Sequence, residues 1–518
     1  MKTATKILLC LLSLCIILGA FAACGEKKES TSAETTGQTD NGTEVTTTPE
    51  DDGIPTIDKT FNNMELTILL RQNTANQYGR EWGYDAGTDN LSEQIVKRNS
   101  RVEQDLDISL AFKTMVDDSA GTDYVNKVVQ AWRSGLNEVD IVSSYAAYST
   151  LPAAMECYAN LLDGNRFPYF QFYHSYWNRG YLDVAELNEK LFTTVGDANL
   201  SVYDRTIITY VNKNLAVENN VALDDIYETV LAGDWTYEKF YKIVTDIGYH
   251  DIDDEEGVSG EDFFALTSIK SSEAPDGFLQ AFDLAIFEKD PEGNWSLAGS
   301  SMRNKLEDGM TKIQNLFNNS NSAFTRGDSS LNTERFTERR AVFNIDVIYH
   351  YDSALNKMLA MKDEIGMIPV PKYDENQKSY KASVQDAHNV VSVIDYGNAS
   401  GERYEAISAF LELLNYDSYQ NLRPYYFERM IKTRYVDGAE DAQIFDIILA
   451  STAWDFSDVY GGNLSITSDS GTTMWAPRHL LWRAAFQNNV AVSTRFSTFE
   501  TTIDTNLAKF LTWMKGQS

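Results

Sequence analysis

The chain has 518 residues and a formal net charge of −32, from 44 basic and 76 acidic side chains. This length allows two or more domains, each with its own core. The charge argues against a nucleic-acid partner, whose phosphates Lys and Arg neutralise, and against adsorption to anionic lipid.

The chain begins with the pattern of an export signal at residues 1–23. Lys2 and Lys6 precede an apolar run that ends at Ala22. A basic start, an apolar segment and small residues form a secretory leader. The run is short for a membrane span, which needs about 20 residues. We therefore expect residues 1–23 to be a signal peptide that is removed.

Cys24 follows directly after this run, and the stretch from Phe21 to Cys24 resembles the lipobox of a bacterial lipoprotein signal. The usual lipobox has Leu where this chain has Phe21. The resemblance implies that Cys24 becomes the lipidated N-terminus. It also implies that the protein works on the extracellular face of the bacterial cytoplasmic membrane. A plain signal peptide with a chance Cys, or a single membrane anchor, is the alternative.

A polar linker follows the leader. Residues 25–56 are rich in Thr, Ser, Glu, Gly and Asp and nearly lack large apolar side chains. Such a segment cannot bury enough apolar surface to offset the entropy of ordering, so we expect residues 24–60 to be a flexible tether. Beyond the tether, Cys157 is the only cysteine. An internal disulfide is therefore excluded, and no Cys and His spacing matches a zinc site.

From residue 61 onward, strand-like and helix-like segments alternate. Strands are predicted at residues 65–70, 107–112 and 140–142, with amphipathic helices at 89–106 and 122–136. Later segments repeat the pattern: strands at 206–211, 341–345 and 390–394, an extended stretch at 365–371, and helices that begin at Thr236 and span 405–415. This alternation indicates an α/β protein with mainly parallel sheet.

Several of these segments resemble, in order, the extracellular solute-binding proteins of ABC transporters, in the carbohydrate-associated (family 1-like) branch. The matching stretches cover most of residues 61–420: a strand and ligand-side loop at 140–144, a segment entering the hinge at 189–197, a strand with Asn212-Lys213 at 210–215, a helix start at 233–236, and a return crossing at 366–373.

The resemblance implies an α/β fold of two lobes joined by a hinge. The ligand is then held in the cleft between the lobes and trapped when they close. We expect lobe 1 to comprise residues 61–197 plus 371–394, and lobe 2 to comprise residues 198–370 plus 395–518. A membrane permease is the expected partner.

The sequence is rich in aromatic residues, with 28 Tyr, 25 Phe and 9 Trp. A sugar has an apolar face and a rim of hydroxyls, which suits an aromatic platform beside Asp, Asn, Arg or His. The side chains that we predict to contact the ligand follow strands, lie near the expected hinge or stand in polar loops. They are Arg71, Tyr145, Trp177, Asn178, Asp197, Asp204, Asp346, His388, Trp454 and Trp475.

These residues also have structural interpretations. Trp177 can cover the edge of a lobe's core, and Arg71 can form a surface salt bridge. Asp197 can cap or turn the backbone. Tyr145 can pack in the next helix, and a lone histidine such as His388 is more often structural than a ligand contact.

Residues 251–262 resemble a degenerate calcium loop. An EF-hand loop has Gly at position six and Glu at position twelve, whereas this chain has Glu256 and Asp262 there. We therefore favour a solvated acidic turn, with calcium binding by this loop as the open alternative, and we expect no cofactor.

Together these features predict a non-enzymatic, monomeric receptor that captures a carbohydrate, in particular an oligosaccharide, and delivers it to an ABC importer. Two alternatives stay open: the same fold with a peptide ligand, and an exported glycoside hydrolase. A hydrolase needs two carboxylates about 5–10 Å apart, and no local motif marks such a pair. Nucleophile-elbow, His-Glu-x-x-His and phosphate-loop motifs are absent from the sequence.

Overall fold

The computed structural model describes residues 53–72, 77–84, 90–116, 122–252, 259, 261–319, 322–326, 329–348, 358, 360–397, 399–427, 438–467 and 474–516. The expected leader, Cys24 and most of the expected tether lie outside these ranges. Within them, no helix combines the length and the apolar character that a bilayer crossing needs.

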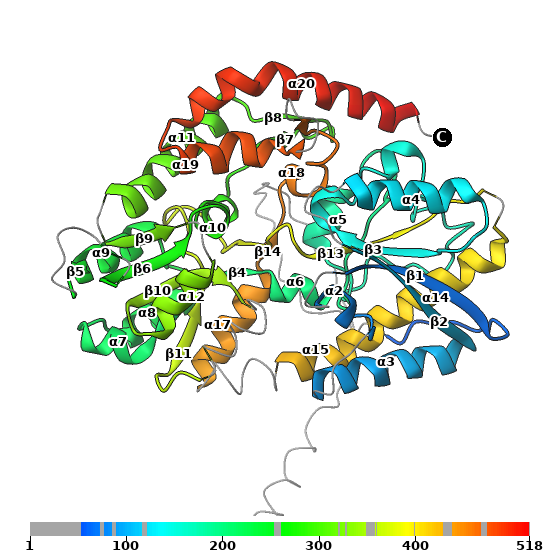
Figure 1. Cartoon of the computed structure of the whole chain (residues 1–518), viewed down its shortest axis with the longest axis horizontal. Helices are drawn as coiled ribbons and strands as arrows, with labels where there is room; N and C mark the ends of the chain where they lie inside the picture. The colour runs from blue at the N-terminus through cyan, green and yellow to red at the C-terminus, as the bar shows by residue number, and fades with distance from the viewer. Residues whose placement is uncertain are drawn as a thin grey trace, which may run out of the picture. The chain divides into compact units, whose positions relative to one another are not determined.

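The first sheet combines three strands from the N-terminal part of the chain with one returning strand (Figure 1). Its order is β13-β3-β1-β2. β1 is parallel to β2 and β3, and β13 is antiparallel to β3. The bounds are β1 Met64–Gln72, β2 Ile108–Val116, β3 Ile141–Tyr145 and β13 Asn389–Val393. The four predicted strands in these regions are therefore confirmed.

Continuous apolar runs explain why these strands form the core of the lobe. Leu66, Ile68 and Leu70 of β1 are fully buried, as expected for a parallel strand that is covered on both faces. In helix α3, which covers this sheet, Ile95 and Val102 lie on the buried side. The helices of this lobe are α3 Asn90–Leu106, α4 Thr122–Ser134 and α14 Gly401–Asp417.

Helix α14 corrects part of the predicted division into lobes. The sequence places residues 395–518 in lobe 2, but α14 packs against α3 beside the first sheet. Arg403 of α14 donates to the buried carboxylate of Asp140 at 2.6 Å, next to the start of β3. The sequence cannot show this placement, because a helix that returns late in the chain carries no local mark of the sheet that it covers.

The second sheet is mixed, which corrects the prediction of mainly parallel strands. Its order is β11-β4-β10-β6-β5, with β9 beside β6. β4 is antiparallel to β10 and β11, whereas β6 is parallel to β10 and β9. The bounds are β4 Ile207–Asn212, β5 Tyr249–His250, β6 Phe263–Ile269, β9 Ala323–Arg326, β10 Ala341–Val347 and β11 Ile365–Ile368.

Several helices belong to the lobe of the second sheet. Asn212, at the end of β4, caps the first of them by accepting the Leu215 N–H at 3.0 Å, as expected for an N-cap asparagine. Thr236 immediately precedes α9, as predicted. The bounds are α7 Lys213–Glu218, α8 Leu223–Leu231, α9 Tyr237–Ile247, α10 Glu273–Ala281, α11 Ser300–Gln314, α12 Ser329–Thr337 and α17 Ala439–Ala450.

Two neighbouring segments carry the chain between the sheets. Thr194 pairs with Val391 at the end near the first sheet, and Thr206 pairs with Val384 at the end near the second. The first of these segments contains the short helix α6, Leu200–Asp204. Residues 194–206 and 384–391 are called the crossing segments below.

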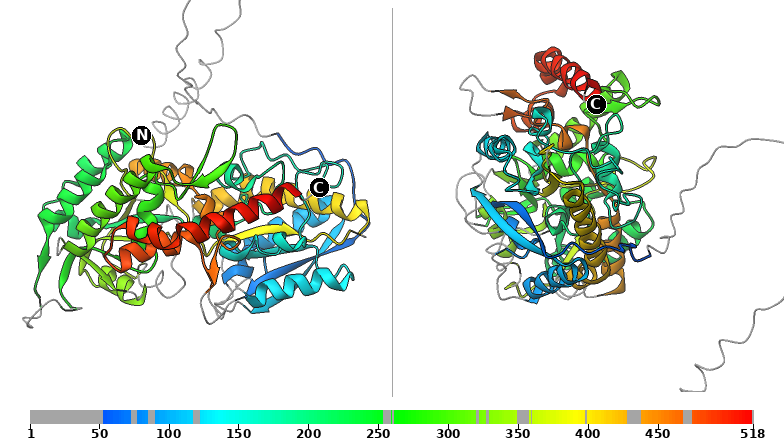
Figure 2. Two further views of the ribbon diagram at one scale, coloured as in Figure 1. Left: turned by 90° about the horizontal axis from the view of Figure 1, so that it is seen from above. Right: turned by 90° about the vertical axis from the view of Figure 1, so that its right-hand side faces the viewer.

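The C-terminal helices contact both lobes. Helix α20 is the long red helix in Figure 2. It packs against α11 of the second lobe, and the ring of its Trp513 lies 6.2 Å from that of Phe192, just before the first crossing segment. The remaining bounds are α18 Phe456–Val459, a π-helical turn His479–Arg483, α19 Ala484–Gln487 and α20 Val492–Gly516.

Candidate ligand-binding site

The first sheet brings two predicted ligand residues to one edge. β1 and β3 are parallel neighbours, so their carboxyl ends meet, and these ends carry Arg71 and Tyr145. The guanidinium carbon of Arg71 lies 4.1 Å from the centre of the Tyr145 ring. Because α/β sheets bind ligands beyond the carboxyl ends of their strands, this edge is a candidate contact surface.

The second crossing segment runs along the same edge. Asn389 pairs with Tyr145 in the antiparallel register of β13 and β3. Arg71 Nη1 donates to the carbonyl of Ala387 at 3.3 Å, and Tyr145 Oη donates to the carboxylate of Asp386 at 3.4 Å. Both hydrogen bonds are long.

The same segment also reaches the edge of the second sheet. Asp346 lies near the carboxyl end of β10, and Glu273 follows β6 at the start of α10. Gln385 Nε2 donates to Glu273 at 2.6 Å, and Arg205 Nη1 donates to Gln385 Oε1 at 3.0 Å. Burial, with the nearby charge of Asp346, raises the pKa of Glu273 to about 8. One short segment therefore contacts the facing edges of both sheets.

Asp386 is the centre of a buried charge network that no sequence pattern reveals. Its carboxylate accepts from Arg478 at 2.6 Å and Arg483 at 3.3 Å and lies 3.2 Å from His479 Nε2. Arg483 Nε also donates to Asp276 of α10 at 2.8 Å. Burial opposes ionisation, but the two arginines hold the pKa of Asp386 well below its usual value. The network fixes the crossing segment to α10 and to the C-terminal part of the chain.

His388, two residues after Asp386, lies beside Trp454. They are 1% and 6% exposed, and their ring centres are 5.9 Å apart. Both rings meet Tyr181 edge-on, at 6.5 and 5.6 Å. His388 Nδ1 lies 2.9 Å from the carbonyl oxygen of Gln385. Burial lowers the pKa of His388 to about 4, so the imidazole is neutral at neutral pH.

Comparison with known proteins identifies the fold. No family model and no curated protein matches the sequence. Solved structures do match. An ABC substrate-binding protein from Listeria monocytogenes, in complex with cycloalternan, is 13% identical, with a TM-score of 0.51 over 86% of this chain and 99% of that one. The chain has the fold of ABC-transporter substrate-binding proteins.

Two further solved structures agree. The galacto-N-biose/lacto-N-biose I-binding protein of the ABC transporter from Bifidobacterium longum is 11% identical, with a TM-score of 0.54 over 87% of this chain and 99% of that one. UgpB from Mycobacterium tuberculosis, in complex with glycerophosphocholine, is 14% identical, with a TM-score of 0.51 over the same shares. The prediction of a two-lobe α/β fold is confirmed.

In this substrate-binding fold, Trp177 is a core residue and not a surface platform, which corrects its predicted role. Its side chain is 1% exposed. The ring packs against Phe172 at 4.9 Å, and the indole Nε1 donates to Glu412 of α14 at 3.0 Å. This is the alternative stated for Trp177, in which it covers the core of a lobe. Its neighbour Asn178 caps α5, Arg179–Ala185, through the N–H of Tyr181 at 3.0 Å.

Asp197 and Asp204 flank α6 and brace the first crossing segment. Asp197 accepts hydrogen bonds from the hydroxyl of Tyr203 and from Arg423 Nη1, the latter at 3.1 Å. Asp204 accepts from the hydroxyl of Tyr426, and burial raises the pKa of Asp204 to about 6. Both carboxylates therefore bind side chains that hold the first crossing segment in place.

The last two predicted residues have different positions. Asp346 is fully buried, and its carboxylate accepts the Val347 N–H at 2.8 Å and Asn332 Nδ2 at 3.4 Å. Its charge contributes, after burial, to the raised pKa of Glu273. Trp475 lies in β16, Met474–Trp475, but its side chain is outside the described part of the structure.

The acidic loop is held by its own last residue. Asp262 Oδ1 accepts the Ile252 N–H at 3.1 Å, and Oδ2 accepts the Ser259 N–H at 2.7 Å and the Tyr249 hydroxyl at 2.8 Å. These hydrogen bonds, first that of Ser259, lower the pKa of Asp262. Residues 253–258 and 260 lie outside the described ranges. The carboxylate at position twelve thus accepts two N–H groups of the loop and the hydroxyl of Tyr249, just before it.

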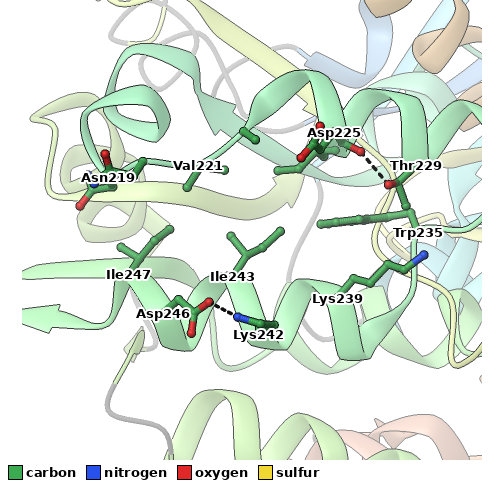
Figure 3. A pocket seen from close by; sticks show the side chains of 13 residues that line it. Asn219, Val221, Asp225, Thr229, Trp235, Lys239, Lys242, Ile243, Asp246 and Ile247 are labelled. Atoms are coloured by element: carbon green, nitrogen blue, oxygen red, sulfur yellow. Dashed lines mark hydrogen bonds and ion pairs between the residues drawn. The ribbon is translucent and has the colours of Figure 1, made fainter.

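A separate pocket of about 550 Å³ lies between α8 and α9 (Figure 3). Its apolar wall includes Trp235, Ile243 and Ile247, and the ion pair of Lys242 with Asp246 lies at its rim. None of the predicted ligand residues lines this pocket. We therefore assign it no part in ligand capture.

Proposed function

We propose that this protein is a lipid-anchored extracellular receptor that captures an oligosaccharide between its two lobes and delivers it unchanged to an ABC importer. The observation that carries the proposal is the edge where the ring of Tyr145 lies beside Arg71 and Asp386. An aromatic ring suits the apolar face of a sugar, and charged partners hold its hydroxyls more firmly than neutral ones.

The solved neighbours support a carbohydrate as the ligand class. One holds cycloalternan and another is a galacto-N-biose/lacto-N-biose I-binding protein in complex with lacto-N-biose. A third holds glycerophosphocholine, so the ligand class needs a direct test. The lipid anchor is supported by the leader pattern before Cys24.

The test is a thermal-shift screen of the mature chain with Cys24→Ser against maltotetraose, lacto-N-biose, trialanine and glycerophosphocholine. A ligand at a hundred times its dissociation constant stabilises a protein by about 2.7 kcal/mol. We expect a saccharide to raise the melting temperature and to be recovered intact. If trialanine alone stabilises the protein, the proposed ligand class changes from a carbohydrate to a peptide. A cleaved saccharide would favour the glycoside hydrolase.

A further inference from the structure

Two buried polar atoms beside the candidate site lack a hydrogen-bond partner among the described residues. They are Nε2 of His388 and Nε1 of Trp454. Leaving a polar atom unpaired in a protein interior is unfavourable, and nearly all such atoms in folded proteins are paired with protein or with ordered water. Each of these two atoms therefore needs a partner from outside the described residues.

The two atoms have opposite hydrogen-bonding character. The indole Nε1–H of Trp454 can only donate. Nδ1 of His388 lies 2.9 Å from the carbonyl oxygen of Gln385. Because a carbonyl can only accept, Nδ1 carries the ring proton, and Nε2 of the neutral ring is then an acceptor. The two rings that carry this donor and this acceptor have their centres 5.9 Å apart.

The two rings are held as neighbours by a third. Their planes cross at 61°, and each is nearly perpendicular to Tyr181, whose hydroxyl is fixed to Thr193 Oγ1 at 2.7 Å. Tyr181 comes from α5 and His388 from the second crossing segment, while Trp454 follows β14, Thr452–Ala453. A site whose sides come from three separate segments can open and close when the lobes move.

We propose that His388 and Trp454 form a subsite that takes one uncharged hydroxyl group of the ligand. A hydroxyl donates its proton to Nε2 and accepts the indole N–H, so one small group satisfies both atoms. A carboxylate has no proton to donate, and an ammonium has no lone pair to accept. The subsite therefore favours a neutral polyhydroxylated ligand over the charged ends of a peptide. This inference rests on the proposed function and narrows its substrate class.

The test compares three variants of the mature chain with Cys24→Ser. Trp454→Phe removes the indole donor and keeps an aromatic ring. His388→Asn removes Nε2 and keeps an amide near the place of Nδ1. Trp295→Phe is the matched control, because its buried Nε1 also lacks a partner in the described structure but lies on β8, Trp295–Leu297, stacked on Phe456 at 4.4 Å. The probes are maltotetraose, lacto-N-biose and trialanine.

Two readouts are needed. The indole ¹H–¹⁵N signal of Trp454 is assigned by its loss in Trp454→Phe, and calorimetry gives dissociation constants. We expect a saccharide to shift the indole signal of Trp454 and not that of Trp295. Trp454→Phe and His388→Asn should each weaken saccharide binding about tenfold, the effect of one lost hydrogen bond in a closed site. Trp295→Phe should leave the dissociation constant within about twofold.

The possible failures are distinguishable. A saccharide that binds without shifting the Trp454 signal would overturn the subsite and leave the receptor proposal standing, and the pair would then hold a water molecule only. Binding of trialanine alone, or of none of the probes, would overturn both proposals. Melting temperatures show whether the variants fold. If His388→Asn does not fold, the affinity of Trp454→Phe and the shift of the indole signal still test the subsite.

Discussion

At the scale of single residues, hydrogen bonding separates two buried tryptophans: the indole N–H of Trp177 is paired, and that of Trp454 has no partner among the described residues. Trp177 shares the carboxylate of Glu412 with the Tyr176 hydroxyl at 2.5 Å and the Gln171 N–H at 3.2 Å. The sequence shows an aromatic stretch at this point. It cannot show the buried acceptor, because Glu412 lies 235 positions beyond Trp177.

Replacing Trp177 by Ala should therefore lower stability rather than affinity. The change removes a large buried ring and one of the three donors to Glu412, so we expect the free energy of unfolding to fall by about 3–5 kcal/mol in denaturant titrations. Tyr173→Ala, at a 72% exposed side chain in the same loop, is the control and should change it by less than about 0.5 kcal/mol. Weaker ligand binding at unchanged stability would return Trp177 to the site.

At the scale of elements, Glu81 ties both crossing segments to the first lobe. Glu81 follows α2, Gln77–Arg80. Its Oε2 accepts the N–H of Ser201 in α6 at 2.9 Å, and its Oε1 accepts Asn389 Nδ2 at 2.8 Å. The Asn389 N–H in turn donates to Ser201 Oγ at 3.0 Å. Burial, with a smaller contribution from the charge of Asp204, raises the pKa of Glu81 to about 7.

This raised pKa should make stability depend on pH. The pKa of Glu81 is higher in the folded chain than its ordinary value of 4.5, so protonation favours folding. The contribution is fully present below about pH 4.5 and is lost as the pH rises through about 7. We expect Glu81→Gln to flatten the fall in unfolding free energy across this window, as urea titrations at several pH values would show.

Glu228→Gln, on the exposed side of α8, is the control for Glu81→Gln and should keep the pH dependence of the unmodified chain. Asp204 still titrates in the Glu81 variant, since its pKa is raised to about 6, so part of the slope should remain. A Glu81→Gln profile parallel to that of the unmodified chain would contradict the assignment.

The elements that the sequence predicts correctly are those with strong local patterns. β1 and α3 show this, because an apolar run and a one-sided spacing of apolar residues are local signals. The placement of α14 against α3, and the antiparallel pairing of β4 with β10, depend on contacts between segments far apart in the chain. Such pairings leave no local pattern to read.

At the scale of the whole molecule, the fold explains which predicted site residues meet. Arg71 and Tyr145 are brought together because parallel strands end at one edge, and His388 joins them on the returning segment. The position after a strand is visible in the sequence. The partnership of Asp386 with Arg478 is not, because 92 positions separate them and only the folded chain places the C-terminal part beside the crossing.

The proposed receptor binds one saccharide at the Tyr145 edge and releases it unchanged. Calorimetric titration of the stabilising saccharide into the mature Cys24→Ser chain tests this proposal most directly, with Tyr145→Ala as the site variant and Tyr241→Ala, a partly buried tyrosine of α9, as the control. We predict one intact saccharide per chain, about tenfold weaker binding in Tyr145→Ala, and unchanged binding in the control. Equal affinity in Tyr145→Ala, or a cleaved saccharide after the titration, would contradict the account.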